Sequence, residues 1–81
     1  MIPYGHYPFN DDFEKFFAEK RPLRLTKKVV ISLTSLEKDK LAHFYHFSAK
    51  VEGDSTEVRG LIYPGDNMNV CAVQHQREVP A

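Results

Sequence analysis

A period of two over residues 41–51 limits the folds open to this chain more than any other feature of its sequence. A strand points successive side chains to opposite sides, so the alternation divides these residues between two faces. One face is apolar enough to line a core and holds Leu41, His43, Tyr45, Phe47, Ala49 and Val51. The other is polar around one large ring and holds Ala42, Phe44, His46, Ser48, Lys50 and Glu52. We expect a long strand here, with Phe44 either exposed or covered by the N-terminal segment.

A helix over residues 35–46 is the competing prediction for this part of the chain. Thr34 and Glu37 have the spacing of a capping box, a pattern that starts many helices. Residues 42–51 are nevertheless rich in aromatic and other strand-compatible side chains, and their faces separate more cleanly at period two. The strand is therefore favoured.

Residues 1–9 have neither a helical nor a strand period. They contain two prolines, a glycine and the rings of Tyr4, Tyr7 and Phe9. We expect an ordered aromatic arm that lies over the domain or docks on a partner.

One amphipathic helix is expected after this arm, ending at about Lys20. Asn10 and Asp11 are good N-cap residues, and Asp11 has Glu14 at capping-box spacing. Pro22 ends the helix because the residue before a proline is pushed out of the helical region. Three rings at i, i+3 and i+4 spacing form an apolar stripe for a core: Phe13, Phe16 and Phe17.

Three further strands follow from alternation and turn residues, over residues 23–34, 58–63 and 68–75. Lys27 interrupts the first of them and marks a bulge or a strand start. Gly60 marks a bulge or a close backbone approach. The connections are a polar segment at 37–40, a hairpin turn at 52–55 with Gly53 at positive φ, and a type II turn at 63–66 with Gly65 in the left-handed position. Residues 76–81 are expected to be frayed.

Together these elements predict a single small domain over residues 1–81, of class α+β. An N-terminal helix would pack on a curved four-stranded antiparallel meander and bury its phenylalanine stripe against the sheet. This order of elements is similar to that of cystatin-like folds, a likeness of topology that no sequence signature accompanies. The pattern leaves open which strand forms the edge of the sheet.

The composition is that of one globular domain with a thin core. Of 81 residues, 42% are hydrophobic and 27% charged, and a chain of this size buries only about 60–65% of its unfolded surface. The single cysteine, Cys71, allows no intrachain disulfide, which favours a reducing, cytoplasmic setting. The first residues lack the pattern of a secretory signal, and no apolar run is long enough to span a membrane.

The net charge of zero hides an uneven distribution. Residues 15–28 carry six cations against the single acid Glu19, a local balance of +5. A solvated helix end accounts for such a patch more simply than a ligand does. The zero total argues against a dedicated nucleic-acid binder of high isoelectric point. The basic patch to be located consists of Lys20, Arg21, Arg24, Lys27 and Lys28.

No motif for catalysis, a metal or a cofactor rises above background. His43 and His46 would lie on opposite faces of a strand, where they cannot chelate one ion. Cys71 lies in an apolar strand, where a thiol is inert rather than nucleophilic. Phosphate-binding glycine loops and nucleophile elbows are absent from the sequence. We expect no enzyme, no metal site and no cofactor.

Two functions from different classes remain. The favoured one is a small protein-binding module, an inhibitor or regulator of the kind that phages and mobile elements encode, which occupies a surface of its partner. Its candidate contact residues are Phe44, His46, Tyr63, Tyr4 and Tyr7. An edge strand could also pair with a partner's sheet or with a second copy, giving a homodimer. The alternative is a single-stranded nucleic-acid binder that combines Phe44 and His46 with nearby cations, namely Lys50, Arg24 and Lys28.

Overall fold

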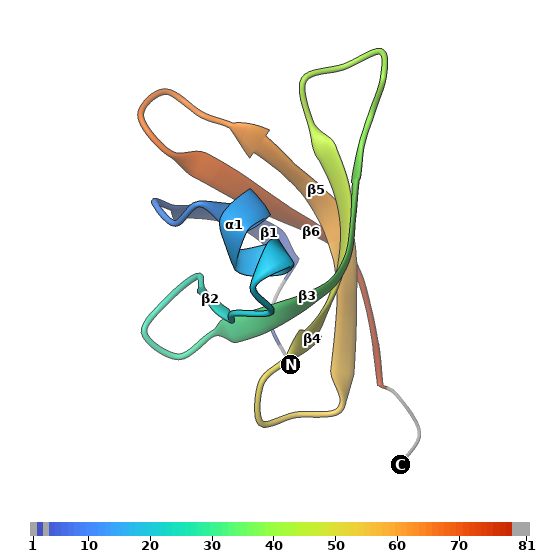
Figure 1. Cartoon of the computed structure of the whole chain (residues 1–81). Coiled ribbons are helices and arrows are strands. Elements are labelled where there is room, and N and C mark those ends of the chain that lie inside the picture. Colours follow the sequence, from blue (N-terminus) through green and yellow to red (C-terminus); the bar gives the residue numbers. More distant parts are fainter. Residues whose placement is uncertain (1, 3, 79–81) are drawn as a thin grey trace.

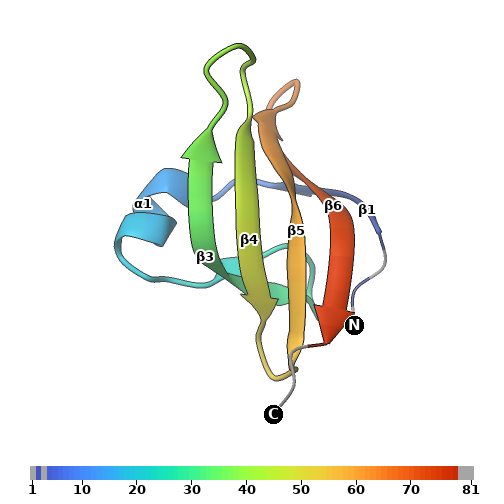
Figure 2. The same cartoon turned by 90° about the vertical axis from the view of Figure 1, so that its right-hand side faces the viewer.

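The computed structural model describes residue 2 and residues 4–78, and it arranges them as one antiparallel sheet with one short helix. Strands make up 55% of the structure and helix 8%, and the six strands form a nearly closed barrel. Figures 1 and 2 show the sheet curling around the helix. The elements are β1 (Gly5–Phe9), α1 (Phe13–Ala18), β2 (Leu23–Arg24), β3 (Val30–Lys38), β4 (Tyr45–Val51), β5 (Thr56–Pro64) and β6 (Asn69–Glu78).

The strand order is β1-β6-β5-β4-β3-β2, and every neighbouring pair is antiparallel. The predicted α+β fold, a helix on a four-stranded meander with a cystatin-like order of elements, is therefore wrong. β3 to β6 do form a meander, but β1 and β2 extend it at both sides, and α1 has only six residues. The sheet buries its inner face by curling on itself, so a helical layer is not needed.

The core consists of the inward side chains of the strands together with Phe13 of α1. Along β4 the predicted alternation is correct, because Phe47, Ala49 and Val51 are buried while His46 and Lys50 are exposed. The fully buried apolar positions are Leu23, Ile31, Ala49, Val58, Ile62 and Cys71.

The predicted arm without a strand period is wrong for residues 5–9, which form β1 beside β6. Tyr7 and Phe9 are more buried than His6 and Pro8, so the segment does alternate. β1 is an edge strand, which is where a sheet tolerates a proline. Met1 and Pro3 lie outside the described residues.

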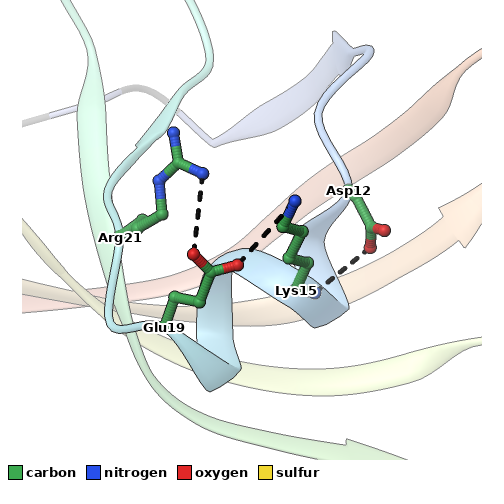
Figure 3. A network of polar contacts seen from close by, with 4 residues as sticks. All are labelled: Asp12, Lys15, Glu19 and Arg21. Atoms are coloured by element: carbon green, nitrogen blue, oxygen red, sulfur yellow. Dashed lines mark hydrogen bonds and ion pairs between the residues drawn. The ribbon is translucent and has the colours of Figure 1, made fainter.

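The helix is shorter than predicted and begins one residue later. Asp12, rather than Asp11, is the N-cap, and its Oδ1 accepts a hydrogen bond from the Lys15 N–H at 3.1 Å (Figure 3). Lys20 has a φ of 58°, so the chain leaves the helical conformation before Pro22. Phe13 is buried, whereas Phe16 and Phe17 are half-buried.

The middle strands have different limits from those predicted. Residues 25–29 form a loop, so Lys27 lies between two strands, and β3 continues to Lys38. The connection to β4 therefore covers 39–44 instead of 37–40, and Leu41 lies on it, 98% exposed. The competing helix over 35–46 is not formed.

The glycine predictions have mixed outcomes. Gly53 has a φ of 78°, so the prediction of a positive φ there is confirmed. Gly65 is not among the described glycines with positive φ, so the prediction of a type II turn at residues 63–66 is wrong. Gly60 does mark a close approach, because a Cβ there would overlap the carbonyl oxygen of Ala72.

The C-terminal strand is longer than predicted and is not an edge. β6 extends through Glu78, so residues 76–78 are paired rather than frayed, and β6 lies between β1 and β5. The last part of the predicted tail, 79–81, lies outside the described residues.

Candidate functional site

The outer face of β3, β4, β5 and β6 is open in the part of the chain that the structure describes. Figure 2 looks directly onto this face, and α1 and β2 lie behind it. Every outward side chain on these strands therefore meets solvent or a ligand.

Four polar side chains form a row across this face. The register pairs Ser35 with Ser48, Ser48 with Arg59, and Arg59 with His75. We call Ser35, Ser48, Arg59 and His75 the polar row.

A β-bulge lies at each end of the polar row. Register shifts between Leu33 and Ser35 and between Arg59 and Gly60 leave Thr34 of β3 and Gln74 of β6 without a directly paired residue. Bulges redirect nearby side chains and are enriched next to binding sites.

Two depressions adjoin at the polar row. The larger, of about 310 Å³, is lined by all four residues of the row together with Glu37, His46 and Gln74. The smaller, of about 300 Å³, is lined by Glu57, Gln76 and Arg77 as well as by Arg59 and His75. Arg59 and His75 belong to both, so the row is the boundary between the two hollows.

Cations outnumber carboxylates around Glu57, on the part of this face next to the 52–55 turn. Glu57 is paired across the strands with Lys50 on one side and Arg77 on the other. Its Oε1 also lies 3.5 Å from the Nε of Arg59. One carboxylate thus lies among three cationic side chains.

Three of the five predicted protein-contact residues are located on this outer face. His46 is exposed and Phe44 is half-buried, with the two rings edge to face at 5.2 Å. The ring of Tyr63 lies edge to face with that of His6 at 6.5 Å. The predicted alternative, that the N-terminal segment covers Phe44, does not fit residues 5–9, because they form β1 beside β6 and not beside β4.

The other two predicted contact residues are elsewhere. Tyr4 is 64% exposed before β1. Tyr7 is half-buried opposite Cys71, and burial, followed by the nearby Cys71, raises the pKa of its hydroxyl. The five predicted residues therefore do not form one cluster.

The predicted basic patch lies away from the rings. Arg24 pairs with Val30 at the start of β3, whereas His46 pairs with Glu37 near its end. Lys27 and Lys28 are on the 25–29 loop. The predicted combination of Arg24 and Lys28 with Phe44 is therefore wrong, and the cation that shares a strand face with His46 is Lys50.

The remaining basic residues make local contacts at the end of α1. The guanidinium of Arg21 lies 4.4 Å from the centre of the Phe16 ring and 3.9 Å from Glu19. Glu19 also lies 4.0 Å from Lys15 (Figure 3). Lys20 is exposed next to this network.

A third hollow, of about 270 Å³, opens at one end of the barrel, and we call it the mouth pocket. Tyr45 donates a hydrogen bond to Glu14 at 3.0 Å, which raises the pKa of the Tyr45 hydroxyl. The Phe13 and Tyr45 rings meet edge to face at 5.1 Å. Its lining residues are Phe13, Glu14, Lys38, His43, Tyr45, Pro64 and Asn69.

Two exposed apolar side chains belong to the loops at this end of the barrel. Leu41 is 98% exposed on the 39–44 loop, and Met68 is 42% exposed on the 65–68 loop. Figure 1 shows these loops, green and orange, projecting from the same end of the sheet.

The loop that carries Leu41 is held in place by Asp39. The Asp39 N–H donates to the carbonyl oxygen of Phe44 at 3.0 Å, and Asp39 Oδ1 accepts from the Leu41 N–H at 2.9 Å. Asp39 Oδ2 lies 3.3 Å from His46 Nε2. The backbone hydrogen bond from Leu41, with a smaller effect of His46, holds the pKa of Asp39 below its ordinary value.

A cluster suited to binding a metal ion is not assembled within residue 2 and residues 4–78. Three or more histidine, cysteine or acidic side chains able to hold a metal do not come together in this region. Burial raises the pKa of the Cys71 thiol to about 12, so its thiolate is disfavoured. Among the same residues there is no helix long and apolar enough to cross a membrane.

Comparison with family models, curated proteins and solved structures finds no match to this chain.

The sequence analysis missed the polar row and the exposed methionine. Arg59 alternates with buried Val58 and Gly60, so its outward direction could be read from period two. Its position beside Ser48 and His75 could not, because it depends on pairing and on two bulges. Met68 lies next to a predicted turn, where a large apolar side chain is the available signal.

Proposed function

We propose that this protein is a protein-binding module and that it contacts its partner through the end of the barrel at which the mouth pocket opens. Leu41 and Met68 pack on the partner, and the mouth pocket receives one of the partner's apolar side chains. By occupying that surface the protein acts as an inhibitor or regulator of its partner.

The observation that carries this proposal is the exposure of Leu41 on an ordered loop. A leucine side chain that is 98% exposed gains burial only from a partner, and Met68 adds a second exposed apolar side chain on a loop at the same end of the sheet. Asp39 fixes the loop by hydrogen bonds, so little conformational freedom is lost when the loop binds.

The mouth pocket favours a side chain over a free small molecule. Its volume of about 270 Å³ is below the range of roughly 300–1,000 Å³ that is usual for ligand sites. The aromatic Phe13 and Tyr45 suit an apolar group, and Met68 can adapt its shape to a partner.

Site-specific photocrosslinking tests the proposal. A benzoyl-phenylalanine is placed at Leu41 or, as the control, at Ser55, an exposed residue of the hairpin turn between β4 and β5. We expect one discrete protein adduct from position 41 in cells of the source organism and none from position 55. No adduct at 41, or the same adducts at both positions, would contradict the proposal.

A matched pair of substitutions then measures the contribution of the apolar side chain. Leu41→Asp and Ser55→Asp each add one negative charge to an exposed loop, and both should change stability by about 0.5 kcal/mol or less. Leu41→Asp should weaken binding of the captured partner about 30-fold or more, as a central interface residue does. Equal affinities for the two variants would remove Leu41 from the interface.

A further inference from the structure

We infer that the polar row and the cations beside it bind the phosphates of a single-stranded nucleic acid. Phe44 lies on the same 39–44 loop as Leu41, but the larger depression shares no lining residue with the mouth pocket, so either inference can fail alone.

The four side chains of the polar row can donate hydrogen bonds, and Glu37 is the carboxylate that lines the larger hollow with them. Ser35 and Ser48 offer hydroxyl groups, Arg59 a guanidinium and His75 an imidazole, from four neighbouring strands. Arginine binds phosphate through two parallel N–H groups, and hydroxyls add hydrogen bonds to the same oxygens. The larger depression brings all four side chains to one hollow.

The charge beside the row is complementary to phosphate. Lys50, Arg59 and Arg77 surround Glu57, and Glu37 lines the larger hollow, so the cations beside the row exceed the carboxylates by one. Glu57 is shielded, with 18% of its side chain exposed, whereas Arg59 is 61% exposed. An approaching anion therefore meets Arg59 before Glu57.

The shape of the face suits an extended chain rather than one ion. Two hollows of about 310 and 300 Å³ adjoin at Arg59 and His75, so adjacent phosphates can lie on either side of the row. Bulges at both ends of the row redirect the flanking strands.

Aromatic rings beside the row favour nucleic acid over an acidic protein segment. His46 lines the larger hollow, and Phe44 packs edge to face against it. Single strands are held on sheets by cations along the backbone and by rings on which unpaired bases stack. An acidic protein segment would use the cations but would have no need of the rings.

Fluorescence anisotropy with labelled oligothymidylate and oligouridylate tests the inference. Three cationic contacts predict a slope of log affinity against log salt of about −2, which is a loss of about 20-fold between 50 mM and 200 mM salt. No binding to either oligonucleotide at 50 mM salt would overturn the inference.

A charge-matched pair of variants locates the contact. Arg59→Ala with Arg77→Ala should weaken binding at least tenfold at 50 mM salt and reduce the slope to about −0.7. Lys27→Ala with Lys28→Ala removes the same charge from the 25–29 loop and should change affinity by about threefold or less. Equal losses in the two pairs would show a non-specific charge effect and overturn the site.

Two further measurements keep the test decisive if the arginine pair fails to fold. Phe44→Ala should weaken binding about fivefold or more with an unchanged salt slope, because it removes a stacking surface and no charge. Poly-glutamate at equal charge concentration should not displace the oligonucleotide. Unchanged affinity of Phe44→Ala, or equal displacement by poly-glutamate, would assign the face to acidic protein segments instead.

Discussion

Replacing Gly60 with alanine should disrupt the pairing of β5 with β6. The added Cβ would overlap the carbonyl oxygen of Ala72 and lie 3.0 Å from the Phe47 ring. The obstructing oxygen belongs to the backbone of a paired strand, so it cannot move aside as a flexible side chain can. Overpacking a core costs about 1–3 kcal/mol and occasionally more. We expect Gly60→Ala to cost about 3 kcal/mol.

That cost is a large part of what a domain of this size has. At about 0.05–0.15 kcal/mol per residue, the free energy of unfolding is roughly 4–12 kcal/mol. A loss of about 3 kcal/mol lowers the Tm by roughly 12–24 °C for a domain of this length. Urea unfolding followed by circular dichroism measures the free energy, and a thermal scan measures the Tm.

Gly53→Ala is the control for this experiment. A Cβ there meets no atom within 4 Å, but Gly53 has a φ of 78°, which costs a non-glycine residue about 1–2 kcal/mol. Wild type should therefore be the most stable of the three proteins, Gly53→Ala less stable, and Gly60→Ala the least stable. A Gly60→Ala variant at least as stable as Gly53→Ala would refute the close packing of β5 against β6.

Two further predictions concern ionisable groups. Cys71 is buried, and the pKa of its thiol is raised to about 12. A thiol reagent at pH 8 should therefore label the folded protein only as fast as it opens, and the urea-unfolded protein at once. Labelling within seconds without denaturant would contradict the packing of β6. The folded-state pKa of Asp39 is lowered, so its contribution to stability is complete at neutral pH and is lost as pH falls below about 4 through that pKa. The NMR amide signal of Leu41 should shift in that range in wild type but not in Asp39→Asn, and the same shift in both would exclude the Asp39 hydrogen bond as its cause.

Local patterns were enough to predict much of the sheet. The alternation of Phe47, Ala49 and Val51 gave the inward face of β4, and Gly60 signalled a close backbone approach. Phe13 was correctly assigned to the core. Each of these predictions depends on a pattern within a single strand or helix, and such a pattern can be read from neighbouring residues in the sequence.

The fold class failed because it depends on which strands pair. The burial of Tyr7 and Phe9 follows a period of two, but the two prolines in residues 1–9 obscured the strand. That strand then pairs with β6, far along the chain. A single sequence contains no local signal for such a partner, so β1 and the nearly closed barrel were missed.

The candidate sites depend on the same non-local information. The polar row exists because Ser35, Ser48, Arg59 and His75 come into register only after the extra residues Thr34 and Gln74 are accommodated. A shift of one residue would turn each side chain to the opposite face. The exposure of Leu41 was missed for a simpler reason, since its apolar character fitted the core face of a longer strand.

The pairing of β1 with β6 also bears on how the chain reaches its folded state. Gly5 lies opposite Val73, so the six-stranded sheet cannot be completed until the ribosome has released residues near both ends of the described region. Phe9 and Phe13, which are buried in the folded structure, have to remain exposed to the cell until then. Folds rich in such distant pairings form slowly, over milliseconds to seconds. β1, which is made long before its partner, is thus among the last strands to be secured, and its aromatic residues can meet other partners until β6 has been synthesised.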